Sequence, residues 1–312
     1  MPSNQTPLGA LPARFRRSRL LVVGCGDIGL RVANLLSGKV TVRALSSQQL
    51  RAPLLREAGV TPLLGNLDQP HSLRRLSGLA QRVLHLAPPA KLGTTDARSQ
   101  ALLRALRGRA VPTALVYAST SGVYGDCGGE WVREERALSP ITARAQRRAH
   151  AEDHIQFFGR SSGARTSVLR VPGIYAPNRE GGTPLERLHR GTPVLDECDD
   201  VYTNHIHADD LARACIRALW LGGAQRAYNV NDDTAMKMGD YFDAAAKLYG
   251  LPSPPRISRV QAEVQLGEMQ LSFMSESRRM VNKRMKQELR LRLRFPDVLD
   301  GLAAGLQISG AI

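Results

Sequence analysis

A glycine-rich loop between an apolar segment and an amphipathic one constrains the fold most strongly. The loop follows the apolar residues 20–23 and reads Gly24-Cys25-Gly26-Asp27-Ile28-Gly29. The first glycine permits a sharp turn off a strand, and the second lets a pyrophosphate approach the backbone. The third lets the following helix pack closely, with its N-terminal N–H groups facing the anion. This order predicts a dinucleotide site that includes Gly24, Gly26, Asp27, Ile28 and Gly29, and a plain turn between strand and helix is the alternative.

Segments of strand length alternate with longer amphipathic segments through the first half of the chain. We expect further strands at 39–45, 61–64, 82–87, 114–118 and 166–171. We expect helices between them at 27–36, 48–58, 72–79, 95–107 and 142–158. This alternation predicts parallel β-α-β units with right-handed crossovers, and therefore an α/β fold with a Rossmann-type doubly wound parallel sheet. Ligands of such sheets bind at the carboxyl ends of the strands.

The alternation weakens after residue 175, where Pro and Gly interrupt the chain repeatedly. Helices are expected at 209–221, 236–249, 278–289 and 296–306, with a short strand at 227–230. We therefore expect three parts. They are a flexible extension at 1–18, an NAD(P)-binding Rossmann domain at 19–175, and a smaller C-terminal substrate lobe at 176–312 whose segments at 201–230 return to the core.

Composition restricts the class of protein further. The chain is 43% hydrophobic, as globular proteins are, and it has no apolar run of the roughly 18 residues that a membrane helix needs. Its 4 cysteines form no C-x-x-C pair, which favours a reduced, cytoplasmic compartment without structural zinc. The net charge of +15 is densest at 278–294, where nucleic-acid binding and a solvated helix face are the alternatives. No aromatic residues interleave with this run, as stacking on bases would require, so we expect no nucleic acid as a partner. The lack of an apolar run likewise predicts no membrane. The expected partner is a small-molecule substrate.

Motifs further along the chain carry a resemblance to a known family. They are Ser119-Thr120-Ser121-Gly122-Val123-Tyr124-Gly125, Leu169-Arg170-Val171-Pro172-Gly173-Ile174-Tyr175-Ala176-Pro177, Asn204-His205-Ile206-His207-Ala208-Asp209-Asp210-Leu211 and Tyr228-Asn229-Val230. In this order they resemble the motifs of the extended short-chain dehydrogenases/reductases, in the group called the NAD-dependent epimerase/dehydratase family. The resemblance spans residues 20–306. The glycine loop has the spacing G-x-G-x-x-G instead of the family's usual T-G-x-x-G-x-x-G. This difference indicates an atypical branch of the family.

The resemblance also exposes a departure at the expected catalytic helix. The family places Tyr-x-x-x-Lys there, followed four residues later by Glu. With Glu152 in register, Arg148 stands in place of the Lys and Arg144 in place of the Tyr. Arg148 would keep the positive charge and the hydrogen bonds to the nicotinamide ribose, whereas Arg144 stays protonated and is no base near neutral pH. Thr120 aligns with the catalytic Ser/Thr and would bind a substrate oxygen.

Two functions fit this pattern. The first is an NAD(P)-dependent oxidoreductase or epimerase that acts on a small carbonyl or sugar-like substrate, and the retained Thr120 favours it. The second is a catalytically silent NADP-binding redox sensor or regulatory protein, and the missing Tyr favours it. The resemblance further implies a homodimer, because helices such as 95–107 and 142–158 often pair in this family.

The residues after the second strand bear on the choice of cofactor. A fold that prefers NAD has an acid about 20 residues beyond the glycine loop, on the ribose 2′-OH. Residues 40–47 contain none. Arg43, expected at the strand end, would pair with a 2′-phosphate with help from Ser46, and an ordinary surface arginine is the alternative. The sequence therefore favours NADP, with NAD as the second choice. By the family resemblance, the cofactor would also contact Asn66 and Leu67 at the adenine, and Leu86, Ala87 and Pro88.

Two pairs of histidines invite comparison with metal sites. His150 and His154 share one face of a predicted helix, and His205 and His207 share one side of a predicted strand. No third ligand is evident for the first pair. The acids at 209–210 are explained by a helix N-terminus, where they would cap the helix and match its dipole. We therefore expect no metal and a structural, hydrogen-bonded role for His207.

Overall fold

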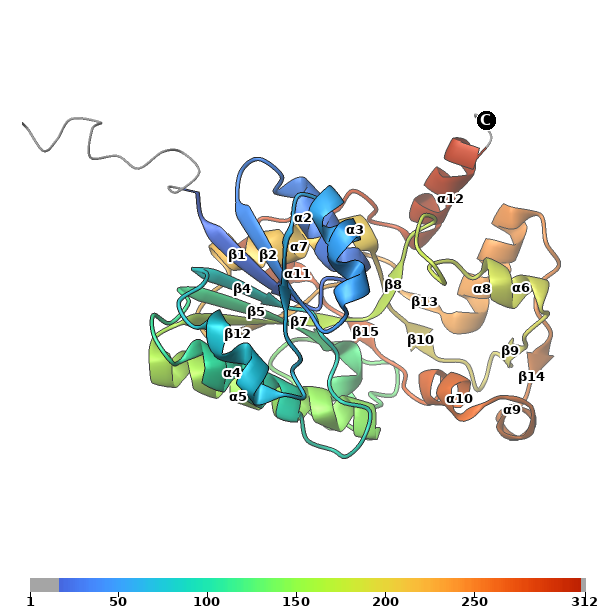
Figure 1. Cartoon of the computed structure of the whole chain (residues 1–312). Helices are drawn as coiled ribbons and strands as arrows, with labels where there is room; N and C mark the ends of the chain where they lie inside the picture. Colours follow the sequence, from blue (N-terminus) through green and yellow to red (C-terminus); the bar gives the residue numbers. More distant parts are fainter. Residues whose placement is uncertain (1–16, 310–312) are drawn as a thin grey trace, which may run out of the picture.

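The structure, a computed structural model, describes residues 17–309 and is shown in Figure 1. The predicted extension at 1–18 falls outside this range except for its last two residues. The core is a seven-stranded parallel sheet in the order β12-β7-β5-β4-β1-β2-β3. The strands are β1 (Arg19–Val23), β2 (Thr41–Ser46), β3 (Thr61–Leu64), β4 (Arg82–His85), β5 (Ala114–Thr120), β7 (Arg165–Val171) and β12 (Arg226–Asn229). The order runs outward from β1 in both directions, so the predicted doubly wound α/β fold is confirmed.

Helices cover both faces of this sheet (Figure 1). One face carries α2 (Asp27–Leu35), α3 (Ala52–Glu57), α7 (Ala208–Leu221) and α11 (Lys283–Glu288). The other face carries α4 (Ala97–Leu106), α5 (Ala143–Ser162) and a 3-10 helix at Pro70–Leu76. Leu20 and Val22 of β1 join the first apolar cluster, and Leu21 and Val23 join the second. Such a strand is apolar throughout because its alternate side chains are buried on opposite faces.

A smaller lobe lies beyond the carboxyl ends of the strands (Figure 1). Its helices are α6 (Leu185–His189), α8 (Met238–Tyr249), α9 (Arg259–Gln265), α10 (Glu268–Met274) and α12 (Val298–Ser309). Its short strands are β9 (Val194–Leu195) with β14 (Arg256–Ile257), and β10 (Tyr202–Thr203) with β13 (Met236–Lys237). They enclose an apolar cluster that includes Leu195, Phe242 and Leu302. A parallel pair, β8 (Gly173–Tyr175) and β11 (His205–His207), connects this lobe to the sheet.

The predicted helix at 278–289 is wrong in its first half. Residues Arg279–Met280 form β15, which pairs in parallel with β6 (Trp131–Val132), and only α11 is helical. The basic run is therefore part of a helix only in α11, where Lys283 is exposed, and its first part is not a solvated helix face. Arg278 is buried and donates from Nη1 to the carbonyl of Gly125 at 2.6 Å. Met285 of α11 joins the core of the sheet, so this late segment also returns to the Rossmann unit.

A buried ion pair ties α5 to β7 just behind the end of β5. The Arg170 guanidinium donates from Nη2 and Nε to Oε2 of Glu152 at 2.9 Å and 3.2 Å. Its Nη1 also donates to the hydroxyl of Tyr124 at 2.8 Å and to the carbonyl of Glu134 at 3.0 Å. Tyr124 in turn donates to Oδ1 of Asn229 at 2.7 Å. This network joins β7, β12, α5 and the 3-10 turn Ser121–Tyr124 at the carboxyl edge of the sheet.

The helix that returns from the lobe begins at a histidine. His207 is the N-cap of α7, and its Nδ1 accepts the backbone N–H of Asp209 at 3.2 Å. The structural role predicted for His207 is confirmed, but the two acids lie in the first turn rather than at the cap. The buried carboxylate of Asp210 accepts the backbone N–H groups of Arg294 and Phe295 at 2.9 Å. Among residues 17–309 no helix is long and apolar enough to cross a membrane.

Candidate functional site

The backbone of the glycine loop has the geometry that each glycine was expected to provide. Gly24 has a φ of +85°, and a Cβ there would lie 2.4 Å from the backbone nitrogen of Ala87. A Cβ on Gly26 would have no atom within 4 Å, so the space beside the start of α2 is open. A Cβ on Gly29 would lie 3.0 Å from Sγ of Cys25, because α2 packs tightly against the strand. The loop therefore fits a pyrophosphate at the N-terminus of α2.

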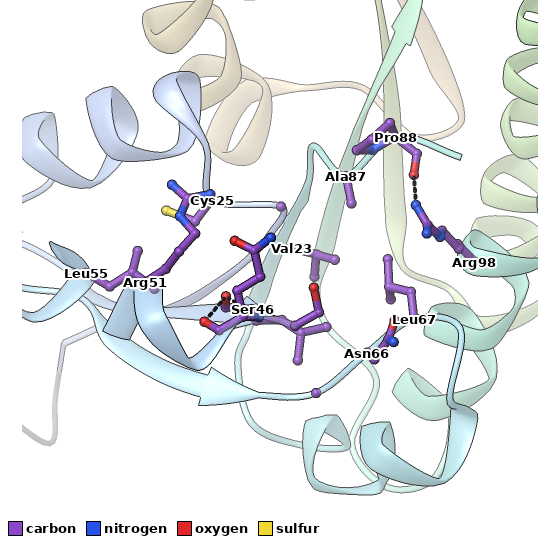
Figure 2. A pocket seen from close by; sticks show the side chains of 15 residues that line it. Val23, Cys25, Ser46, Arg51, Leu55, Asn66, Leu67, Ala87, Pro88 and Arg98 are labelled. Atoms are coloured by element: carbon purple, nitrogen blue, oxygen red, sulfur yellow. Dashed lines mark hydrogen bonds between the residues drawn. The ribbon is translucent and has the colours of Figure 1, made fainter. Parts of the chain in front are cut away.

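A cavity of about 240 Å³ lies beside this loop at the carboxyl ends of β1 to β4 (Figure 2). Several residues predicted to bind the cofactor line it, namely Gly24, Ser46, Asn66, Leu67, Ala87 and Pro88. Five other predicted residues are not part of the lining but neighbour it in sequence, namely Gly26, Asp27, Ile28, Gly29 and Leu86. The carboxylate of Asp27 accepts from Arg31 Nε at 2.9 Å and from Arg179 Nη1 at 2.6 Å.

The prediction that Arg43 stands at the end of the second strand is wrong. β2 continues to Ser46, so Arg43 lies inside the strand, paired in register with Leu21 and Thr61. Its Nη1 donates to the carbonyl of Leu79 at 2.9 Å, and Arg43 does not line the cavity. Arg43 thus lies three residues before the end of β2, too far inside the strand to reach the cavity beyond that end.

The arginine that follows β2 and lines the cavity is Arg51 rather than Arg43. It ends the 3-10 turn Gln49–Arg51, and in Figure 2 its side chain extends toward the glycine loop beside Cys25. Ser46 lies near it and exchanges hydrogen bonds with the backbone of Gln48, at 3.0 Å to the carbonyl and 3.2 Å from the N–H. Within residues 17–309 Arg51 has no carboxylate within ion-pairing distance, and no acidic side chain lines the cavity.

A second, larger cavity of about 550 Å³ lies between the ends of β5 and β7 and the smaller lobe. Thr120 lines it, and its Oγ1 accepts the backbone N–H of Gly122 at 3.3 Å. This leaves the Thr120 hydroxyl proton available to a substrate oxygen. Arg144 lines the same cavity and stacks over Phe273, with Cζ 4.8 Å from the ring centroid. Arg144 therefore places a cation in the wall of this cavity.

Arg148 lies behind the end of β5 and lines neither cavity. Its Nη1 donates to the carbonyl of Ala118 at 2.6 Å and to the hydroxyl of Tyr117 at 3.2 Å. Burial raises the pKa of Tyr117 to about 12, so this phenol stays protonated near neutral pH. The structure thus places Thr120 in a cavity wall and Arg148 in the layer behind it.

Aromatic and imidazole side chains from the lobe complete the second cavity. Tyr175, Tyr202, Tyr241 and His205 line it. His205 stacks on Tyr241 with ring centroids 4.5 Å apart, and burial lowers its pKa to about 4. The imidazole is therefore neutral near neutral pH. Sequence reasoning missed these residues, because only the folded chain brings β8, β10, β11 and α8 around one space.

His150 and His154 are hydrogen-bonded, whereas Nδ1 of His205 has no hydrogen-bond partner within the described residues. His150 and His154 lie with their Nε2 atoms 3.2 Å apart, and Nδ1 of His150 accepts the backbone N–H of Asp96 at 3.1 Å. Across the chain from 17 to 309, no group of three or more His, Cys, Asp or Glu side chains is arranged to hold a metal ion.

Comparison with known proteins now places this arrangement in a family. The sequence profile described as the NAD dependent epimerase/dehydratase family matches residues 20–231. The chain belongs to this family. The match covers the glycine loop, Thr120 and Arg148, and the predicted resemblance is confirmed. A search of curated proteins found no sequence match.

Solved structures share the fold over nearly the whole length of this family member. A protein of unknown function from Silicibacter pomeroyi is 28% identical, with a TM-score of 0.78 over 95% of this chain and 100% of that one. The UDP-glucose 4-epimerase of Thermotoga maritima, solved with UDP-glucose, is 18% identical, with a TM-score of 0.74 over 94% and 99%. That of Thermus thermophilus, solved with NAD, is 22% identical, with a TM-score of 0.71 over 94% and 100%.

The open space at Gly26 gives a direct test of the cofactor site. Gly26 is the N-cap of α2 with a φ of −86°, so alanine fits the backbone, but its methyl group would fill the space that a pyrophosphate needs. We expect Gly26→Ala to weaken NAD(P)H binding by at least about tenfold, or about 1.4 kcal/mol, in a fluorescence titration.

A matched control separates this effect from the loss of a glycine cap. Gly267 is the N-cap of α10 with a φ of −71° and equally open surroundings, and it lines neither cavity. Either substitution costs about 1 kcal/mol of stability at most. Gly267→Ala should bind the cofactor normally, and equal affinities of the two variants would contradict the site.

Proposed function

We propose that this protein is an NADP-dependent oxidoreductase or epimerase of its family that acts on a small carbonyl or sugar-like substrate. The observation that carries the proposal is a cavity without acidic side chains that extends from the glycine loop to Arg51, in the 3-10 turn that follows β2. When bound, the nicotinamide would give or take a hydride. Thr120, in the wall of the larger cavity, would hold the substrate oxygen with its free hydroxyl proton.

The side chains around the end of β2 support NADP as the cofactor. A 2′-phosphate needs a cation and hydroxyl or N–H donors, whereas a 2′-OH is commonly held by an acid. Arg51, Ser46 and Ser47 line this part of the cavity. The other arginine of the lining, Arg98, already holds Asp68 through Nε and Nη2 at 2.7 Å and 2.6 Å. Arg51 is therefore the cation that remains for a phosphate.

Replacing Arg51 tests the cofactor preference. A hydrogen bond to a charged group contributes about 1.5–3 kcal/mol, so Arg51→Met should weaken NADPH binding by about 10- to 150-fold. NADH binding should be unchanged, because NADH has no 2′-phosphate. Calorimetric titration with both nucleotides measures the two effects.

Arg43→Met is the control, since Arg43 lies nearby but bonds to the Leu79 carbonyl. It should leave the ratio of the two affinities unchanged. A parallel loss of NADPH and NADH affinity in Arg51→Met, or a selective loss in Arg43→Met, would contradict this assignment.

The acid/base step needs a donor other than the side chain at position 144. The Arg144 guanidinium does not release its proton near neutral pH. Arg148 would act by its charge, and by hydrogen bonds to the nicotinamide ribose, from behind the end of β5. The proton would come from water, the substrate or another side chain of the cavity wall.

A silent NADP-binding sensor is the second candidate, and one observation favours it. The helix α5 carries no Tyr, and the residue in its place stacks on Phe273 in the cavity wall. NADPH oxidation across a panel of aldehydes, ketones and nucleotide sugars distinguishes the two candidates. Tight NADPH binding without turnover on any of them would favour the sensor.

We also propose a cytoplasmic protein that forms a homodimer through α4 and α5. The four cysteines are free, and three of them are buried, as in reduced compartments. On α5, Phe157 is 57% exposed, and Arg107 at the end of α4 stacks over it with Cζ 5.8 Å from the ring centroid. In size-exclusion chromatography the original protein should elute as a dimer, and Phe157→Ser should shift the elution toward that of a monomer. If the original protein already elutes as a monomer and Phe157→Ser changes nothing, the dimer is contradicted.

A further inference from the structure

Arg187 is a half-buried cation at the edge of the larger cavity. It lies on α6 and stacks over Phe242, with Cζ 4.3 Å from the ring centroid. Its Nε and Nη2 are shielded from water and have no hydrogen-bond partner within the described part of the chain. Burial lowers the pKa of this guanidinium, and the charge of Arg190 lowers it further. Two buried N–H donors without acceptors on a charged group are costly, so this arrangement requires an explanation.

The two unpartnered nitrogens form one edge of the guanidinium, where two parallel N–H groups match a carboxylate or phosphate. The same edge is used elsewhere in this protein. Arg98 donates from Nε and Nη2 to the carboxylate of Asp68, and Arg226 donates from the same two atoms to the carboxylate of Glu288. At Arg187 the same edge has no acceptor among the described residues.

The surrounding cavity has more positive than negative charge. Its charged lining residues are Arg144, Arg179, Arg187, Arg278 and Glu276. Glu276 is paired with Arg278 at 2.9 Å, and Arg179 is paired with Asp27 at 2.6 Å. Arg144 and Arg187 have no carboxylate within ion-pairing distance in residues 17–309. The cavity therefore favours a ligand that brings its own negative charge.

We propose that Arg187 binds an anionic group of the substrate, a carboxylate or a phosphate monoester, while Thr120 holds the oxygen at the reacting carbon. This rests on the proposed function and narrows its substrate class from small carbonyl or sugar-like compounds in general to those that carry an acidic group. Both nitrogens are covered in the present conformation, so binding includes a rotation of the side chain that turns this edge toward the cavity. Pairing with the anion offsets the cost of the rotation, because it gives two buried N–H donors an acceptor.

The test compares charged and neutral probes on the protein saturated with NADPH, so that the anions cannot occupy the cofactor site. The probes are lactate for a carboxylate, glycerol 3-phosphate for a phosphate monoester, and glycerol as the neutral compound. Calorimetry should show at least about tenfold tighter binding of one charged probe than of glycerol, and the preferred probe identifies the anion. Equal, weak binding of all three would overturn the proposal.

Three variants attribute the effect to Arg187. Arg187→Met should abolish the preference for the charged probe and raise the melting temperature of the free protein, because it removes two buried N–H donors that lack acceptors. Arg187→Lys should keep a weaker preference, since an ammonium lacks the bidentate edge. Arg190→Met, an exposed neighbour that pairs with Glu186, is the control and should bind as the original protein does.

The outcomes distinguish this inference from the proposed function. If Arg187→Met binds the charged probe as well as the original protein, the inference fails while NADPH binding stands. If the original protein does not bind NADPH in the preceding titration, the proposed function fails first.

Discussion

Glu152→Ala is expected to lower the free energy of unfolding by about 3–5 kcal/mol, because it leaves a buried guanidinium without its counter-charge. Glu152 is 1% exposed and Arg170 is 4% exposed, so water cannot replace the lost carboxylate. Arg170 would keep only neutral partners, the hydroxyl of Tyr124 and the carbonyl of Glu134. Urea unfolding followed by circular dichroism measures the change.

Two comparisons make this expectation specific. Asp153→Ala removes an exposed carboxylate from the next position of the same helix and should change stability by less than about 0.5 kcal/mol. The double variant Glu152→Leu with Arg170→Met removes both charges and should recover much of the loss, since apolar residues of similar volume often replace buried ion pairs well. A single-variant loss below about 1 kcal/mol would show that the pair contributes little.

The parts of the fold that were predicted correctly depend on local patterns. The continuous apolar strand β1, the glycine loop and the start of α2 follow each other within 17 residues, Arg19–Leu35, and each has its own chemical requirement. The strand predicted at 61–64 matches β3 residue for residue. The structure of such segments is decided by their own residues, so it can be predicted without knowing their distant contacts.

The errors arose where contacts distant in sequence decide the structure. β15 exists because Arg279 and Met280 pair with Trp131 and Val132, almost 150 positions earlier in the chain. A basic, amphipathic stretch reads as a helix when that partner strand is unknown. The same applies to Arg278, whose charge is placed against the Gly125 carbonyl and Glu276 rather than in water.

The residues of the candidate site were likewise predicted where local sequence decides their position, and missed where distant contacts do. The cofactor side follows the strand ends, so six predicted residues line the first cavity, whereas Arg43 lies three residues before the end of β2 and outside the lining. A basic residue within one turn after Ser46-Ser47 is the sequence signal that could have identified Arg51. The substrate side has no such rule, because Arg187 reaches its cavity from a short helix of the lobe, and no motif surrounds it in the sequence.

Gly24→Ala should combine a large loss of stability with loss of the cofactor. At a φ of +85° an L side chain costs about 1–2 kcal/mol. The added Cβ would also lie 2.4 Å from the backbone nitrogen of Ala87 and 2.6 Å from its Cα, and relieving such overpacking costs a further 1–3 kcal/mol, roughly. Because Gly24 and Ala87 both line the first cavity, moving them apart deforms the cofactor site. We expect NADPH affinity to fall by more than about 100-fold, or about 2.7 kcal/mol.

Gly38→Ala isolates the steric part of this effect. Gly38 has a φ of +73°, so alanine suffers comparable backbone strain there, but its Cβ would have no atom within 4 Å. It should cost only about 1–2 kcal/mol and leave NADPH binding intact. The difference between the two variants, measured by urea unfolding and by NADPH titration, then reports the contact between the glycine loop and the strand end after β4. If Gly24→Ala loses no more stability or affinity than Gly38→Ala, the close approach of Gly24 to Ala87 does not shape the cofactor site.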